Sequence, residues 1–294
     1  MNLNVFPPIV TSPSIGVAFG GGGARGFAHI NVIEALDELG VRPSLLIGTS
    51  IGSVMGAAYA SGMSGKELKE YAIDSISSRR SLYARFWRTR SGNLWDLMSK
   101  GPQSVMKFNI ERLLEGFLPS SIPNQFEQLR IPFKAIATDF YGECDHVMTS
   151  GHLLSALAAS SCIPTVFAPV FRDNCTLIDG GTTNPVPFEY LRGEVDIVIG
   201  VDIVGTTKTL NPVKSTIETA YGASQIFQKT LIDMKTAIHR PDLILKPDVS
   251  HFRTMEFMRA REIIDATAYI KEETKRLVDN LISNYEQNST SVLI

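Results

Sequence analysis

Two glycine-rich turns constrain the fold of this chain more than any other feature. Residues 20–26 follow an apolar run at 14–20, and residues 48–52 follow a second apolar run at 45–47. Such runs are typical of buried strands, and the segment after each turn has the apolar spacing of a helix. Because alternating strands and helices build parallel sheets, we expect both turns at the carboxyl edge of one sheet.

The rest of the chain continues this pattern. Apolar runs predict further strands at residues 132–138, 146–148, 175–178, 195–204 and 243–245. Apolar spacing predicts helices at residues 26–39, 51–60 and 153–161, and one long amphipathic helix at 256–285. We therefore expect an α/β fold with a mostly parallel central sheet, helices on both faces and a C-terminal helical extension.

The domain organisation follows from shifts in composition along the chain. We expect an N-terminal tail at 1–13, one α/β domain at 14–205, and a C-terminal extension at 206–294 that packs on the same domain. Residues 78–123 are polar, irregular and rich in arginine, and we interpret them as a lid-like insertion in the domain.

Composition excludes several classes of protein. With 44% hydrophobic residues in 294, the chain can form a core, which excludes a disordered protein. The net charge of −2 lacks the basic excess typical of nucleic-acid-binding proteins, so no nucleic-acid partner is expected. Three cysteines without a C-x-x-C pair indicate a reducing compartment, with neither disulfides nor a zinc site.

Targeting signals are weak. Residues 1–13 contain no lysine or arginine, so we expect no signal peptide, and the predicted location is the cytoplasm. Two stretches without charge, 43–65 and 147–171, are long enough to span a bilayer. Glycine, serine, threonine and proline interrupt both, so we interpret them as buried core.

The first glycine-rich turn has three possible roles. Gly21, Gly23 and Gly26 match the dinucleotide-binding pattern G-x-G-x-x-G, but no acidic residue ends the next strand to bind a ribose. A Walker A motif is excluded, because no Lys-Ser/Thr pair follows. Glycine amides beside a helix N-terminus also stabilise other anions, including an oxyanion. Nucleotide binding, an oxyanion hole and a packed structural turn all remain open.

The second turn has the pattern G-x-S-x-G, from Gly48 through Ser50 to Gly52. Between a strand and a helix, flanking glycines permit the sharp turn that exposes a serine nucleophile, and the amide of Ile51 would face the same site. The alternative is an ordinary helix N-cap serine. Acyl transfer needs an attacking oxygen and donors for the oxyanion, and the two turns together offer both.

Two residues are candidates for the general base. His251 follows the last predicted strand, as a Ser–Asp–His order requires. Asp179 follows another strand, and Gly180 and Gly181 permit a tight turn toward Ser50. A buried aspartate has a raised pKa and can accept the serine proton directly. We expect His29 to hold the glycine turn or to pack, and the other histidines to be structural or exposed.

Three motifs in this order resemble those of bacterial patatin-like phospholipases. They are Gly21-Gly-Gly-Ala-Arg-Gly26, Gly48-Thr-Ser-Ile-Gly52 and Asp179-Gly-Gly181, and the similarity includes Ala158-Ala-Ser-Ser-Cys-Ile-Pro164 before the aspartate. The resemblance covers about residues 14 to 205.

The resemblance implies a patatin-like sheet related to that of cytosolic phospholipase A2, with a Ser–Asp dyad and no catalytic histidine. Ser50 would be the nucleophile and Asp179 the base. The oxyanion hole would consist of the amides of Gly21, Gly22 and Gly23, with that of Ile51. Arg25 would hold the loop or an anion, and the remaining glycines of the motifs would support the turns, namely Gly26, Gly48, Gly52, Gly180 and Gly181.

A basic and aromatic segment lies within the predicted insertion. Between residues 79 and 90 five arginines occur without an acidic residue. Basic and aromatic side chains together are typical of contacts with anionic lipid. The candidates for this contact are Arg85, Phe86, Trp87 and Arg88. The alternative is a solvated loop.

The sequence therefore predicts a serine ester hydrolase that acts on phospholipids or other lipid esters through an acyl-enzyme, without metal or cofactor. One alternative is a Ser–Asp–His esterase that uses His251. Others are a nucleotide-binding regulatory module and a lipid-binding scaffold without activity. The oligomeric state is not predicted.

Overall fold

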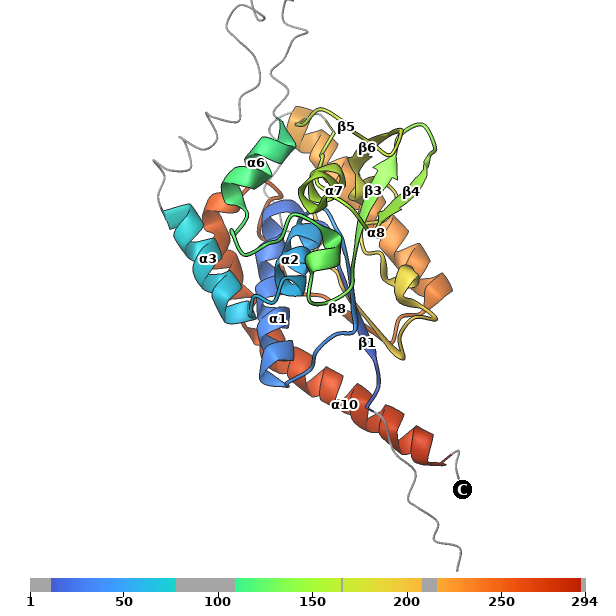
Figure 1. Ribbon diagram of the computed structural model, residues 1–294. Helices are drawn as coiled ribbons and strands as arrows, with labels where there is room; N and C mark the ends of the chain where they lie inside the picture. Colours follow the sequence, from blue (N-terminus) through green and yellow to red (C-terminus); the bar gives the residue numbers. More distant parts are fainter. Residues whose placement is uncertain (1–11, 78–108, 165, 208–215, 292–294) are drawn as a thin grey trace, which may run out of the picture.

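The computed structural model describes residues 12–77, 109–164, 166–207 and 216–291 (Figure 1). Within them, eight strands form one sheet in the order β5-β6-β3-β2-β1-β7-β8, with β4 paired to β3. The strands are β1 (Ile15–Phe19), β2 (Leu45–Thr49), β3 (Phe133–Asp139), β4 (Cys144–Met148), β5 (Val170–Arg172), β6 (Cys175–Asp179), β7 (Ile197–Val201) and β8 (Leu243–Leu245).

The central part of the sheet is parallel, as the sequence predicts. Strands β3, β2, β1, β7 and β8 pair in parallel, while β4 and β6 run antiparallel to β3. Parallel strands leave all their carboxyl ends at one edge. Both glycine-rich turns therefore lie at the upper edge of the sheet in Figure 1.

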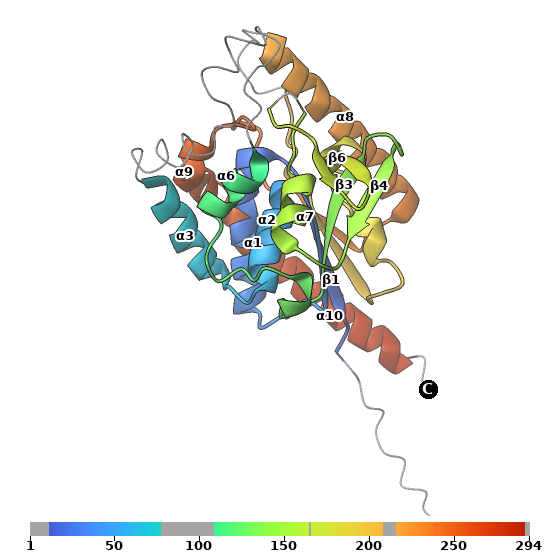
Figure 2. The ribbon, with the colours of Figure 1, turned by 45° about the horizontal axis from the view of Figure 1, so that its top comes forward.

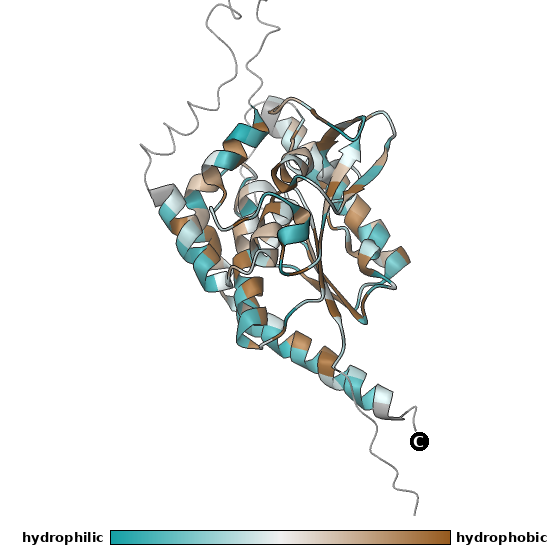
Figure 3. Cartoon of the chain, viewed as in Figure 1, coloured by the Kyte–Doolittle hydropathy of each residue, from teal (hydrophilic) through white to brown (hydrophobic). Residues whose placement is uncertain are grey.

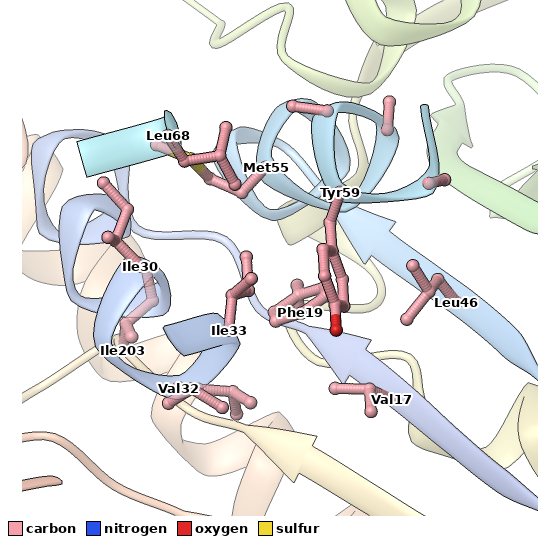
Figure 4. Packing of buried hydrophobic residues seen from close by; sticks show 14 of the residues in the cluster. Val17, Phe19, Ile30, Val32, Ile33, Leu46, Met55, Tyr59, Leu68 and Ile203 are labelled. Atoms are coloured by element: carbon pink, nitrogen blue, oxygen red, sulfur yellow. The ribbon is translucent and has the colours of Figure 1, made fainter. Parts of the chain in front are cut away.

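Alternate residues of the central strands enter two different cores. Val17 and Phe19 of β1 belong to the larger core (Figure 4), whereas Ala18 between them belongs to the smaller core on the other face. Successive side chains of a strand point to opposite faces, so both faces of this sheet are buried. This explains why the strands read as continuous apolar runs.

Helices cover both faces, and most of them, though not α8, turn a mainly hydrophilic side to solvent (Figure 3). The helices are α1 (His29–Glu38), α2 (Ile51–Ala60), α3 (Gly65–Ser77), α6 (Ile110–Phe117), α7 (Leu153–Ser160), α8 (Thr216–His239), α9 (Ala260–Ala266) and α10 (Tyr269–Ser291). Side chains of α1, α2, α9 and α10 build the larger core. Helix α8 reaches the smaller core through Ile232.

The C-terminal helix differs from the prediction, because two helices occupy the segment 256–285. Helix α9 ends before Thr267, whose hydroxyl donates to the carbonyl oxygen of Ile263 at 2.7 Å. The side-chain amide of Asn31 on α1 donates to the Thr267 hydroxyl at 3.0 Å and to the Ile264 carbonyl at 2.8 Å. This tertiary contact satisfies groups at the helix end, so the chain can turn there before α10 begins.

Three of the described helices were not expected from the sequence. Helix α3 follows α2 within the α/β domain, α8 spans 24 residues of the C-terminal extension, and α6 lies within the segment interpreted as irregular. Residues 78–108 of that segment, and residues 1–11 of the expected tail, lie outside the described residues. Among the described helices, none combines the length and the apolar character that a membrane span requires.

We expect Asn31→Ala to lower the free energy of unfolding by about 1–3 kcal/mol, because it removes a buried donor from two acceptors that remain buried. Urea unfolding monitored by circular dichroism measures the change. Asn280→Ala, on the exposed surface of α10, is the matched control and should change stability by less than about 0.5 kcal/mol. Equal losses in the two variants would contradict this role of Asn31.

Candidate active site

Ser50 occupies a strained turn between β2 and α2. Its φ is 54° and its ψ is −128°, a conformation that few non-glycine residues adopt. The turn brings the chain so close to β1 that a Cβ atom at Gly52 would lie 2.1 Å from the Phe19 carbonyl oxygen. A glycine at this position is therefore required by the close approach of the two backbones.

The side chains of Ser50 and Asp179 form a hydrogen bond. The Ser50 hydroxyl donates to Oδ2 of Asp179 at 2.7 Å, and the Gly181 amide donates to Oδ1 at 2.8 Å. Both side chains are largely buried, with relative exposures of 5% and 6%. The carboxylate is thus oriented by two donors and faces the serine directly.

Strand β3 brings these two residues together. At its middle, Ile136 is the parallel partner of Thr49, the residue before Ser50. The next residue, Ala137, is the antiparallel partner of Asp179. The last residue of β2 and the last residue of β6 therefore meet along one side of β3.

Burial changes the acidity of Asp179. Desolvation raises the pKa of its carboxyl group from 3.8 to about 6, although the hydrogen bonds from Ser50 and Gly181 favour the charged form. A carboxylate with this pKa is a stronger base than an exposed aspartate and is still mostly ionised at pH 7.

The glycine-rich turn lies beside Ser50. The Gly21 amide donates to the Pro185 carbonyl oxygen at 2.9 Å, and the Ala24 amide donates to the Thr254 carbonyl oxygen at 2.8 Å. Between them, Gly22 and Gly23 lead into a short 3₁₀ helix, where the first amides lack acceptors within the helix. Gly23 has a φ of 60°, and a Cβ atom there would lie 2.3 Å from the Thr254 oxygen.

Arg25 is buried beneath this turn. Its guanidinium donates to the carbonyl oxygens of Phe252, at 2.8 Å, and Val204, and to the side chain of Gln225 at 3.2 Å. Burial lowers its pKa to about 10. Of the two roles predicted for Arg25, the described contacts correspond to holding the loop, because they join it to segments that follow β7 and β8.

His29 also contacts the turn. The side chain is fully buried, and burial lowers its pKa to about 4, so the ring is neutral at pH 7. Its Nε2 lies 2.9 Å from the Gly20 carbonyl oxygen, to which a neutral ring can donate. His29 thus packs beneath the turn and does not contact Ser50.

Two buried residues that the sequence analysis did not single out orient the site. The hydroxyl of Ser160 donates to the Ile136 carbonyl oxygen at 2.6 Å and accepts a hydrogen bond from the Ser50 amide at 2.9 Å. The backbone of Asn184 accepts a hydrogen bond from the Thr49 hydroxyl at 2.8 Å. Ser160 lies in the motif at residues 158–164 before the aspartate, and this motif was the sequence signal that could have identified it.

A cavity of about 210 Å³ opens onto Ser50 and Asp179. Its lining includes the glycine turn on one side and Thr254 after β8 on another. Helix α8 contributes a third side through Ala220, Tyr221, Ser224, Gln225 and Gln228. The C-terminal extension therefore forms much of the cavity wall.

The other residues predicted from the sequence fall into four groups. A Cβ atom at Gly26, Gly48 or Gly180 would lie between 2.2 and 2.4 Å from neighbouring atoms, and one at Gly181 would lie 2.9 Å from Gln228. Ile51 is the first residue of α2, and its amide follows Ser50. His251 is exposed and does not line the cavity. The membrane-contact candidates lie outside the described residues, namely Arg85, Phe86, Trp87 and Arg88.

The described residues include no group of three or more histidine, cysteine or carboxylate side chains that could hold a metal ion. The chemistry that they do offer is nucleophilic. A serine hydroxyl bonded to a buried carboxylate, with backbone amides nearby, can attack a carbonyl carbon and stabilise the resulting oxyanion.

Comparisons with known proteins place the chain in a family. The family model described as patatin-like phospholipase matches residues 17–192. An uncharacterised NTE family protein of Mycobacterium tuberculosis is 33% identical over 197 residues, which cover 67% of this chain and 51% of that protein. Human patatin-like phospholipase domain-containing protein 6 is 30% identical over 204 residues, covering 68% of this chain and 14% of that protein.

The chain spans about half the length of the mycobacterial relative. Among solved structures, VipD from Legionella pneumophila aligns with a TM-score of 0.46 and 13% identity, covering 90% of this chain and 67% of that chain. The family model covers more than half of the chain and includes Ser50 and Asp179. This protein belongs to the patatin-like phospholipase family.

Proposed function

We propose that the protein is a serine acyl hydrolase that cleaves carboxylic esters of lipids. The hydrogen bond between Ser50 and Asp179 carries this proposal, because it joins a nucleophile to a base without an intervening histidine. The family name and that of the human relative support phospholipids as the proposed substrate class. Phospholipase A or lysophospholipase activity is the specific form that we propose.

The reaction proceeds in two steps. The Ser50 oxygen attacks the ester carbonyl carbon while Asp179 accepts the hydroxyl proton, which gives a tetrahedral oxyanion. The carbon–oxygen bond to the alcohol then breaks, Asp179 returns the proton to the alcohol, and the acyl group remains on Ser50. In the second step Asp179 takes a proton from water, the hydroxide attacks the acyl carbonyl, and the fatty acid leaves as Ser50 recovers its proton.

Backbone amides would stabilise the oxyanion. The proposed donors are the amides of Gly22, Gly23 and Ile51, which lie at the starts of helical segments beside Ser50. Gly21, predicted as a fourth donor, already donates to Pro185. Its role in this proposal is to hold the turn.

The C-terminal extension is part of the proposed enzyme. Residues 206–294 line the cavity through α8 and Thr254, and they hold the glycine turn through Arg25, so we propose that they act together with residues 14–205. A location in the cytoplasm with peripheral contact to anionic membrane, through Arg85 to Arg88, remains a prediction from the sequence.

We expect Ser50→Ala to abolish both ester hydrolysis and labelling by a fluorophosphonate probe, because the attacking oxygen is lost. The activity is tested by incubating the wild type with a panel of phospholipids and lysophospholipids and measuring the fatty acid that is released. Ser61→Ala, at the C-terminal end of α2, is the control that should keep the label. Labelling that persists in the Ser50 variant would exclude this serine as the nucleophile.

We expect Asp179→Asn to lower kcat about 10²–10⁴-fold, because the amide cannot accept the serine proton. His251→Ala should keep most of the activity, because this side chain is exposed and lies away from the cavity lining. Steady-state kinetics on a soluble short-chain ester compares the two. The reverse pattern would favour a Ser–Asp–His triad.

We expect kcat/KM on a soluble ester to rise with pH and to level off above a midpoint of about 6. The base must be deprotonated, and burial raises the pKa of Asp179 to about 6, so activity is lost as the pH falls through this value. A pH–rate profile measures the midpoint. A midpoint near 4, the ordinary value for aspartate, would contradict a desolvated base.

A further inference from the structure

Exposed apolar side chains lie on several segments that come near the edge of the sheet where the cavity opens. Most large hydrophobic residues that stay exposed in the described chain lie on segments that follow the carboxyl ends of strands, or on the part of α8 that lines the cavity. We refer to five of them as the apolar rim: Tyr141, Phe171, Phe227, Met255 and Met258. Clusters of this kind mark contact surfaces more often than isolated exposed residues do.

Helix α8 carries the first part of the rim. Ala220 and Ser224 line the cavity and are exposed, so this turn of the helix forms part of the mouth. Phe227 follows Ser224 by three residues and therefore lies on the same face of the helix. Its side chain is 68% exposed. An apolar surface thus continues directly from the mouth of the cavity.

The segment after β8 carries the second part. Thr254 lines the cavity, and Met255 follows it with an exposure of 46%. Met258, in the next turn, is 50% exposed. This segment and α8 are held together at the glycine turn, because Arg25 donates to both Phe252 and Gln225.

Two hairpins carry the third part. Tyr141 lies just beyond β3 and is 80% exposed, while Phe171 on β5 is 73% exposed. Thr176 pairs with Phe171 and accepts a hydrogen bond from the Phe140 amide, so the two hairpins adjoin each other. Figure 2, in which the top of the molecule comes forward, shows these hairpins beside α8.

The size of the cavity indicates what covers this surface. Cavities that enclose a small-molecule ligand measure about 300–1,000 Å³, whereas the described residues enclose about 210 Å³. A lipid with two acyl chains is larger still, so much of it must remain outside while its ester reaches Ser50. If that part stays in the lipid phase, the mouth must touch the lipid surface.

Charges on α8 favour an apolar contact over an electrostatic one. Lys229 pairs with Asp233 at 3.5 Å, and Lys235 pairs with Glu189. Phe227, next to the mouth on the same helix, is uncharged and more than half exposed. An apolar side chain of this kind can enter the interface of a bilayer of any head-group charge.

We propose that the apolar rim is the surface through which the protein contacts the lipid phase that holds its substrate. The inference rests on the proposed function and adds a docking surface that differs from the basic segment at residues 79–90. Contact through the rim brings the mouth of the cavity to the lipid, so that the ester reaches Ser50 without leaving the lipid phase entirely.

Sedimentation of the Ser50→Ala variant of residues 1–294 with phosphatidylcholine vesicles in high salt tests the proposal. The neutral lipid and the salt suppress electrostatic attraction, and the alanine prevents hydrolysis. The rim variant adds Phe227→Gln and Met258→Gln. The matched control adds Met234→Gln and Ile238→Gln, whose side chains are similarly exposed. These residues lie farther from the mouth, because Met234 is about 15 Å along α8 from Ser224, which lines the cavity. Thermal unfolding followed by circular dichroism verifies that each variant folds.

We expect the rim variant to lower the partition into vesicles by about tenfold or more, and the control to lower it less than twofold. Equal losses in both variants, or none in either, would overturn the proposal. A rim variant that converts a dimer into a monomer in light scattering, without losing vesicle binding, would instead identify an interface between copies of this chain.

The proposed function can fail separately from the rim. A Ser50-containing protein that binds vesicles through the rim but releases no fatty acid would contradict the hydrolase and leave the docking surface intact. A protein that hydrolyses a soluble ester but whose vesicle binding is unaffected by the rim variant would contradict only the docking surface.

Discussion

The hydrogen bond between Ser50 and Asp179 depends on the register of three strands. Along β3, the partner changes from β2 to β6 between two consecutive residues, Ile136 and Ala137. Side chains alternate between the faces of a sheet, so a slip of one residue in β6 would turn the carboxylate to the opposite face. The antiparallel β6 is therefore as important for the site as the parallel strands that position the serine.

The glycine turn depends on a part of the chain far from it in sequence. Arg25 carries a buried positive charge, which is unfavourable unless polar groups surround it. Its acceptors are two carbonyl oxygens and Gln225, all from residues beyond 200. The hydrogen bond from Ala24 to Thr254 adds a further tie. Removal of the C-terminal extension would thus leave the Arg25 cation with the Val204 carbonyl oxygen as its one remaining acceptor among those described, and the turn without its contact to Thr254.

The sequence predicted the features that local backbone geometry decides. The turns around Gly23 and Ser50 were found because close approach and unusual dihedral angles demand particular residues there. Helix α8 was missed because its buried side includes Gln225, while Phe227 on its outer side is exposed. The spacing of hydrophobic residues in this segment would therefore assign the exposed side of the helix to the core. The break before α10 was missed because it depends on Asn31, more than 200 residues away.

Two buried titratable groups beside the site act on stability in opposite directions. Burial lowers the pKa of His29 to about 4, below its value of about 6.5 in the unfolded chain. The contribution of this residue to the free energy of unfolding is therefore fully present above pH 6.5 and is lost as the pH falls toward 4, because only the unfolded chain then binds the proton. The pKa of Asp179 is raised to about 6, so its contribution is present below pH 3.8 and is lost as the pH rises through 6.

These two windows overlap, so the two pH dependences of stability largely offset each other between pH 4 and 6. At pH 7 the neutral His29 carries no penalty, whereas the desolvation cost of the Asp179 carboxylate is fully present and the rest of the fold must offset it. The same burial that costs stability at Asp179 gives the carboxylate the basicity that the proposed proton transfer needs. In this site, the energetic cost of burying the base and its chemical usefulness have one physical origin.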